Sequence, residues 1–196
     1  MSSKSTVFYN RFSFLYPVVD VFLSPQKRLL TREINKMPHG QLLDVGVGNG
    51  SHLKYYKRHN ITGIDTSLEM LNKARSSNND RVKLIEMNGE DLSFYSGSFD
   101  YVVLSHVIAV VDDPEQLLLE VYRVLRPGGY LFILNHFTPK NWIRHIDQGF
   151  DYCARLLHFK SIFHQKDLKA LSKLELRSEI STSISGYFKL LIFLKK

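Results

Sequence analysis

The middle of the chain alternates short apolar runs with stretches whose apolar residues recur at helical spacing. Five runs have the length and apolar content of buried strands, and they cover residues 41–46, 61–65, 81–87, 98–107 and 130–137. Helices are expected between them, over 51–59, from 67 to about 75 and from 113 to about 125. Strands that alternate with helices predict βαβ units, and therefore a parallel sheet with helices on both faces.

Local residue choices indicate where two of these helices begin. Asp113 and Pro114 form the pair expected at a helix start, with Asp as the N-cap and Pro at the first helical position. Ser67 is placed to cap the helix before it. The sequence RPGG at 126–129 predicts a turn into the fifth strand.

The two ends of the chain depart from this rhythm. Residues 7–23 are apolar at roughly helical spacing, and a break is expected at Pro17 because a residue before proline disfavours helical backbone. Another helix is expected over 26–36. After the fifth strand, the pattern predicts helices over 141–159 and 165–172.

Two β-like runs, 174–183 and 187–194, close the chain. A short turn at Ser185 and Gly186 separates them, as in a hairpin, so at least one of the two strands should run antiparallel. With the five earlier strands, this pattern predicts an α/β fold. The fold is a doubly wound, mostly parallel seven-stranded sheet with helices on both faces and an antiparallel strand near the C-terminus.

The clearest candidate for chemistry is the segment LLDVGVGNG, Leu42–Gly50, between the first strand and the helix expected after it. Glycines let the backbone turn tightly and let a ligand approach closely, and a helix start offers free N–H groups. The spacing G-x-G-x-G differs from the G-x-G-x-x-G of dinucleotide-binding folds. Asp65 ends the second strand, 21 residues after Asp44, where a carboxylate can accept hydrogen bonds from both hydroxyls of an unphosphorylated ribose.

This pattern resembles that of class I S-adenosylmethionine-dependent methyltransferases, whose fold is Rossmann-like, over residues 37–137. The resemblance implies that S-adenosylmethionine is the cofactor, that Asp44 and the glycine loop surround its methionine part, and that Asp65 holds its ribose. The segment around Gly89 matches the part of the family pattern beside the adenine. The cofactor-binding residues expected from the resemblance are Tyr9, Asp44, Gly46, Gly48, Asn49, Gly50, Asp65, Thr66, Met70, Asn88, Gly89, Glu90, Ser105 and His106.

Four side chains are candidates for the methyl-transfer chemistry itself. His106 and His136 follow strands at the edge where open α/β sheets bind ligands, and histidine titrates near neutrality, so either can take a proton from an amine. Tyr16, seven residues after Tyr9, offers an aromatic face that favours a sulfonium. Tyr187, entering the last strand, is expected beside the acceptor amine on the basis of the resemblance.

Shorter motifs narrow the resemblance. The opening YNRFSFLYPVVD is similar to the start of ubiquinone and menaquinone methyltransferases and of bacterial phosphatidylethanolamine N-methyltransferases. ILNHF at 133–137 and HQKDL at 164–168 are more similar to the phospholipid group. This similarity implies stepwise methylation of phosphatidylethanolamine to phosphatidylcholine. A methyltransferase for a quinone precursor or a soluble small molecule, and a non-catalytic cofactor-binding subunit, are the alternatives.

Length and composition agree with one globular domain. The chain has 196 residues, of which 44% are hydrophobic and 23% charged. We expect an N-terminal helical lid or membrane-facing segment over 1–36, a cofactor-binding core over 37–137, and substrate-side helices and closing strands over 138–196. The single cysteine, Cys153, excludes an internal disulfide framework and a cysteine-based zinc site, and no metal is expected.

The net charge of +7 lies in the flanks of the chain. It is +4 over 1–36, −3 over 37–138, +4 over 139–173 and +2 over 174–196. The basic flanks are rich in aromatic residues and leucine and lack a nucleic-acid recognition motif, which favours an anionic membrane surface over nucleic acid. A solvated basic surface is the alternative.

The sequence also predicts where the protein acts. It contains no run of 18 apolar residues, and its start lacks the apolar core of a signal peptide. We therefore expect a cytoplasmic protein, either soluble or peripheral at the inner face of the membrane, that acts on a lipid or small-molecule methyl acceptor. Its oligomeric state is left open.

Overall fold

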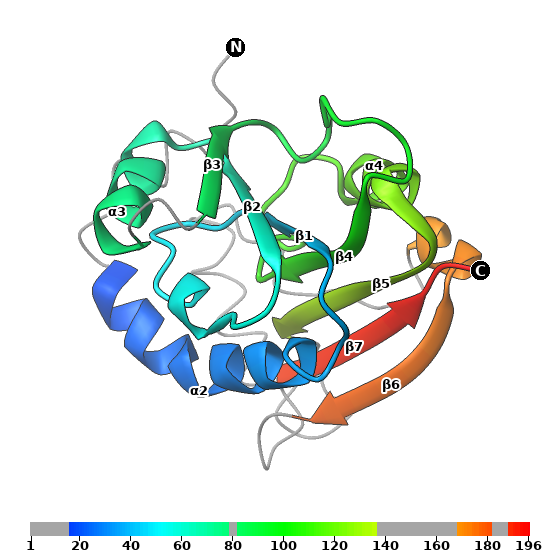
Figure 1. Cartoon of the computed structure of the whole chain (residues 1–196), viewed down its shortest axis with the longest axis horizontal. Coiled ribbons are helices and arrows are strands. Elements are labelled where there is room, and N and C mark those ends of the chain that lie inside the picture. Colours follow the sequence, from blue (N-terminus) through cyan, green and yellow to red (C-terminus); the bar gives the residue numbers. More distant parts are fainter. Residues whose placement is uncertain (1–15, 79–81, 137–167, 182–187) are drawn as a thin grey trace, which may run out of the picture.

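The computed structural model describes residues 16–78, 82–136, 168–181 and 188–196 (Figure 1). Within these ranges the chain forms one sheet of seven strands in the order β3-β2-β1-β4-β5-β7-β6. The strands are β1 (Gln41–Val45), β2 (Asn60–Asp65), β3 (Val82–Glu86), β4 (Phe99–Ser105), β5 (Leu125–His136), β6 (Glu175–Ser181) and β7 (Phe188–Leu194). Strands β1 to β5 run parallel to one another. Strand β7 pairs antiparallel with both β5 and β6. The predicted fold class is confirmed.

Helices cover both faces of this sheet (Figure 1). The side chains of a strand alternate between its two sides, so each face presents apolar residues on which helices pack. One face packs on α4 (Pro114–Val124), whose buried side chains are Leu117, Leu118, Val121 and Val124. The opposite face packs on α2 (Tyr16–Ile34) and α3 (Leu68–Asn78), which contribute Leu30, Ile34 and Leu71. None of the helices in the described ranges combines the length and hydropathy needed to cross a bilayer.

The helix predicted separately over 26–36 is instead part of a longer helix, and the break at Pro17 stays a prediction because residues 1–15 lie outside the described ranges. The helix α2 is continuous from Tyr16 to Ile34, with Pro25 inside it. Pro17 lies in its first turn, where the missing N–H group has no intrahelical partner to lose. Pro25 does remove one helical hydrogen bond, but the fully buried Leu30 and Ile34 hold the helix on the sheet. The rest of the range 7–23, before Tyr16, lies outside the described residues.

The helix predicted over 51–59 is also wrong. Only a single 3₁₀ turn, η1 (Leu53–Tyr55), forms there, and the backbone is extended at Tyr56. The side chain of Asn35, in the turn after α2, explains why no helix continues beyond η1. Its Nδ2 donates to the carbonyl of Tyr55 at 2.8 Å, and its Oδ1 accepts from the amide of Lys57 at 3.0 Å. These two backbone groups are therefore satisfied outside a helix.

The turn predicted at 126–129 is instead part of β5. The pairing of β4 with β5 shifts register between Phe99 and Tyr101, which lie opposite Leu125 and Tyr130. Gly128 adopts the left-handed φ of 77° that this irregularity requires.

The C-terminal elements follow the prediction in outline. Strands β6 and β7 pair as the expected hairpin. A 3₁₀ helix, η3 (Lys169–Lys173), forms within and just beyond the helix predicted over 165–172. The helix predicted over 141–159 lies outside the described residues.

Both predicted N-caps are present. The amide of Met70 donates to Ser67 Oγ at 3.3 Å, and Asp113 Oδ1 accepts from the amides of Glu115 and Gln116, each at 3.0 Å.

Asp113→Ala should lower the free energy of unfolding by about 1 kcal/mol, because it leaves two helix-start amides without their acceptor. Urea denaturation measures the change. The neighbouring exposed Asp112→Ala is the control, and equal stability of the two variants would contradict the capping role.

Candidate active site

The carboxyl ends of four parallel strands bring the expected site residues to one edge of the sheet. Asp44 lies near the end of β1, Asp65 ends β2 and Ser105 ends β4. The strand order runs outward from β1 in both directions, through β2 on one side and β4 on the other. Open α/β sheets bind ligands at such a switch in strand order.

The glycine loop after β1 needs its glycines for conformation. Gly46, Gly48 and Gly50 have φ values of 68°, 58° and 66°, in the left-handed region that other residues adopt at a cost. A side chain at Gly46 would also collide with Val107, which follows β4. The loop is held against β2, because the amides of Gly46 and Val47 both donate to the carbonyl of Ile64. Its backbone is therefore fixed against the end of β2.

Asp65 joins the glycine loop to the end of β2. Its Oδ2 accepts from the amide of Gly48 at 2.8 Å, and its Oδ1 accepts from the amide of Ser67 at 2.9 Å. Burial raises the pKa of Asp65, and the hydrogen bonds from the amides of Ser67, Gly48 and Thr66 oppose that rise. Each carboxylate oxygen keeps a further lone pair, so the side chain can still accept two hydroxyl groups.

Asp44 is completely buried, and among the described residues only one of its two carboxylate oxygens has hydrogen-bond partners. Its Oδ2 lies 2.7 Å from His52 Nε2 and accepts from the Tyr56 hydroxyl at 2.9 Å. Burial and the adjacent carboxylate raise the pKa of Tyr56 well above its usual value, so this hydroxyl stays protonated and donates. Asp44 Oδ1 is buried and has no hydrogen-bond partner among the described residues. A buried carboxylate oxygen without a donor is costly, so Oδ1 is a ready acceptor for a cationic ligand group.

His52 and Tyr56 were not anticipated from the sequence. They lie eight and twelve residues after Asp44, a spacing that carries no known motif. On the helix expected over 51–59 they would have been placed as ordinary helix-face residues. In the structure, Tyr56 follows η1 with extended backbone, and its hydroxyl reaches the carboxylate.

Asn49, Thr66 and Met70 complete the described surroundings of the two aspartates. Asn49 Oδ1 accepts from the amide of Ser51 at 3.1 Å, so this side chain folds back onto its own loop. Thr66 is half-buried next to Asp65, and Met70 is buried in the first turn of α3. All three lie on segments adjoining the strand ends.

The segment expected beside an adenine is bonded to α4. Asn88 Oδ1 accepts from the amide of Glu90 at 3.1 Å, and Glu90 Oε1 accepts from the amide of Asp113 at 2.7 Å. A Cβ atom on Gly89 would lie 2.8 Å from Val45 Cγ1 and 2.9 Å from Leu117 Cδ1. The three residues therefore lie close to the end of β1, and their side-chain bonds fix the loop.

Ser105 and His106 form the end of β4. Ser105 Oγ is buried without a hydrogen-bond partner in the described ranges. His106 has a φ of 61°, and such left-handed backbone in a residue other than glycine is concentrated at functional sites. Its amide donates to the carbonyl of Leu134 at 2.8 Å, and its ring meets that of Phe188 edge-on at 5.7 Å between centroids. Because Phe188 is also the β7 partner of His136, both histidines lie by the start of β7.

Four candidates are only partly described or not described. Tyr9 and Tyr187 lie outside the described residues. Tyr16 begins α2 and His136 ends β5, and the side chains of both lie outside what the structure describes. In the described ranges, no group of three or more His, Cys, Asp or Glu side chains is arranged to hold a metal ion.

Known proteins with related sequences decide the family. The model of a methyltransferase domain family matches residues 43–133. A phosphatidylethanolamine N-methyltransferase of Cereibacter sphaeroides is 33% identical over 164 residues, which cover 80% of this chain and 81% of that protein. This chain belongs to the class I S-adenosylmethionine-dependent methyltransferases. The methyltransferase is also 33% identical to a ubiquinone/menaquinone biosynthesis C-methyltransferase of Geotalea daltonii. That match extends over 172 residues, which cover 82% of this chain and 67% of that protein.

Solved structures agree on the fold of the methyltransferase. An S-adenosylmethionine-dependent methyltransferase of Thermotoga maritima superposes with a TM-score of 0.76 at 22% identity, over 98% of this chain and all of that one. The [4+2]-cyclase SpnF superposes with a TM-score of 0.75 at 14% identity, over 99% and 97% of the two chains. A shared fold therefore does not define the reaction.

S-adenosylmethionine is the cofactor of this methyltransferase, and the strand edge fits it. The glycine loop brings backbone without side chains to this edge at three left-handed positions. Asp44 Oδ1, which has no partner in the described part of the chain, suits an ammonium group, and the half-buried Asp65 carboxylate suits a pair of hydroxyls. These are the groups that the methionine and ribose parts of the cofactor carry.

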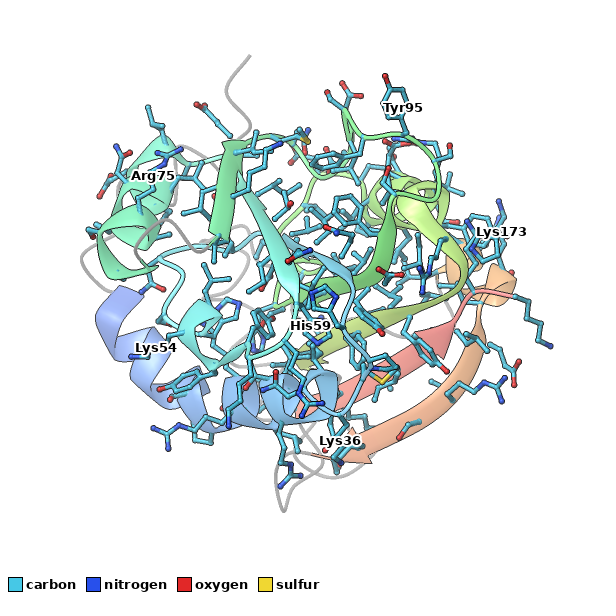
Figure 2. The ribbon with its side chains drawn as sticks, in the orientation of Figure 1. Lys36, Lys54, His59, Arg75, Tyr95 and Lys173 are labelled. Carbon is cyan, nitrogen blue, oxygen red and sulfur yellow. The ribbon has the colours of Figure 1, made fainter. Side chains whose placement is uncertain are left out.

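The bond from Tyr56 to Asp44 yields a test of how this edge is held. Tyr56→Phe should lower the free energy of unfolding by about 2 kcal/mol, because a buried carboxylate loses one of its two donors. Chemical denaturation gives the value. Tyr95→Phe is the control, since Tyr95 is 89% exposed and projects from the surface (Figure 2). A Tyr56→Phe protein as stable as this control would show that the hydrogen bond contributes nothing.

Proposed function

We propose that this methyltransferase methylates the amine of the phosphatidylethanolamine headgroup stepwise toward phosphatidylcholine. The observation that carries the proposal is the similarity to the phosphatidylethanolamine N-methyltransferase, which extends over four fifths of both chains. The match runs well beyond the family model at 43–133 and so includes part of the chain after residue 133, which we assign to the substrate side. The Geotalea protein is matched over a smaller share of its length.

In this proposal the residues at the carboxyl ends of β1 and β2 hold the cofactor. Asp44 Oδ1 accepts the methionine ammonium, the backbone of the loop from Gly46 to Gly50 borders the methionine part, and Asp65 accepts the ribose hydroxyls. The backbone around Gly89 borders the adenine. Tyr9 from the N-terminal segment closes over the cofactor. When bound, S-adenosylmethionine supplies a methyl group on a positively charged sulfur.

The acceptor nitrogen must be neutral to use its lone pair. An alkyl amine has a pKa near that of lysine, about 10.4, so most of it is protonated at neutral pH. His106 at the end of β4 and His136 at the end of β5 are assigned to take this proton and pass it to water. Tyr16 and Tyr187 line the same acceptor side in this assignment.

A lipid headgroup requires contact with a bilayer surface. The segments 1–36 and 139–173 each carry a net charge of +4 and are rich in apolar and aromatic residues. Each Lys or Arg near an anionic bilayer contributes about 1 kcal/mol of attraction. We assign these flanking segments to peripheral attachment, with the core of 37–137 between them carrying the cofactor.

A second acceptor is supported by its own observation. The identity with the Geotalea C-methyltransferase is also 33%, over 82% of this chain. Methylation of a quinone precursor at a ring carbon is therefore the competing function, and the chemistry of the product distinguishes the two.

Labelled S-adenosylmethionine and vesicles test the proposal directly. Vesicles of phosphatidylethanolamine with an anionic lipid should yield mono-, di- and trimethylated lipid, separated by chromatography. Vesicles that lack phosphatidylethanolamine are the control. Label that enters a demethylated quinone, but not lipid, would assign the enzyme to the competing function.

The role of Asp65 is tested by binding alone. Asp65→Asn should weaken binding of S-adenosylmethionine by roughly tenfold to hundredfold, because one oxygen becomes a donor and the charge is lost. Isothermal titration calorimetry gives the dissociation constant. The exposed Glu69→Gln on α3 is the matched control, and equal affinity of the two variants would remove Asp65 from the site.

A further inference from the structure

A completely buried amide without hydrogen bonds lies at the carboxyl end of β5. Asn135 is 1% exposed, and neither its Oδ1 nor its Nδ2 has a partner in the described part of the chain. Most buried polar groups in proteins are hydrogen-bonded, so two partnerless atoms on one side chain require an explanation. A ligand that supplies one donor and one acceptor would satisfy both.

The position of Asn135 places it at the ligand-binding edge. Leu134, the residue before it, pairs with Ser105 and accepts a hydrogen bond from the amide of His106 at 2.8 Å. Ser105 Oγ is likewise buried and partnerless in the described ranges. The adjacent ends of β4 and β5 therefore each carry an unsatisfied polar group at this edge, Ser105 on the α2 face of the sheet and Asn135 on the α4 face.

The alternation of side chains separates Asn135 from the residues assigned to the cofactor. Asp44 shares a face of the sheet with Leu42, in the apolar cluster on the α2 side. Asn135 shares the other face with Ile133, in the cluster on the α4 side. Asn135 is also separated from β1 by the intervening strand β4. The amide is thus better placed for the acceptor than for the cofactor.

We propose that Asn135 binds the methyl acceptor, which is an amine next to an oxygen-bearing headgroup. Its Oδ1 accepts an N–H of the neutral amine, which leaves the nitrogen lone pair free to react. Its Nδ2 donates to a headgroup oxygen. The inference rests on the proposed function, since it assumes an amine acceptor.

This contact predicts a dependence on the number of methyl groups already present. A neutral primary amine has two N–H groups, a monomethylated amine has one, and a dimethylated amine has none. Asn135 Oδ1 can therefore orient the nitrogen in the first two transfers and not in the third. A residue with a purely structural role would affect all three transfers alike.

Asn135→Leu tests the proposal because leucine has the same number and branching of side-chain heavy atoms as asparagine and cannot form hydrogen bonds. Rates are measured with vesicles of phosphatidylethanolamine, its monomethyl derivative and its dimethyl derivative. We expect kcat/KM to fall about tenfold further for the first two lipids than for the dimethyl lipid, because all three lose the bond to Nδ2 and only the first two also lose the bond to Oδ1. The Tm without ligands should be equal to or above that of the wild type, because two partnerless buried atoms are removed. The dissociation constant of S-adenosylmethionine should not change.

Asn72→Leu is the matched control, since Asn72 is exposed on α3 and bonds only Arg75 among the described residues. Unchanged rates for Asn135→Leu, or an equal loss on all three lipids, would overturn the role of Asn135 while the proposed function stands. If the wild type methylates none of the three lipids, the proposed function fails and this inference fails with it.

Discussion

The need to stabilise a buried carboxylate organises the region around the candidate site. Asp44 lies in β1 between two neighbouring strands and is completely buried, so its charge must be met by donors from the same side of the sheet. His52 and Tyr56 contribute the side chains that bond this carboxylate. They lie on either side of the short 3₁₀ segment η1 that follows the glycine loop. Asn35 holds that segment against α2 through two backbone bonds. The carboxylate thus determines the path of the chain as well as the chemistry of the site.

The rest of the edge is fixed in a similar way, by side chains that bond backbone amides. Asp65 joins the glycine loop to the start of α3, and Glu90 joins the loop after β3 to the start of α4. Such bonds position loops without filling the ligand side. Among the polar atoms left over, Asp44 Oδ1, Ser105 Oγ and the amide of Asn135 have no partners in the described residues. They mark where a ligand would complete the hydrogen bonding.

Fold and reaction are separate questions for this protein. The same fold, with TM-scores of 0.76 and 0.75, occurs in a methyltransferase and in a cyclase. The cofactor comes from the family to which the chain belongs, supported by the residues at the ends of β1 and β2. The acceptor depends on the ends of β4 and β5 and on flanking segments, where two relatives with different reactions are equally similar.

The sequence alone predicted the seven strands apart from the start of β5, the alternation of strands and helices after β2, both N-caps and the glycine–aspartate signature, because these depend on periodicity and on contacts between residues near in the chain. It did not determine the ends of two N-terminal elements. Pro25 is tolerated because α2 packs on the sheet, and η1 stops because Asn35 lies beside it. Nor could it find His52, Tyr56 or Asn135 as site residues. Their importance rests on which atoms are paired and which are left partnerless after packing, and only the tertiary structure decides that.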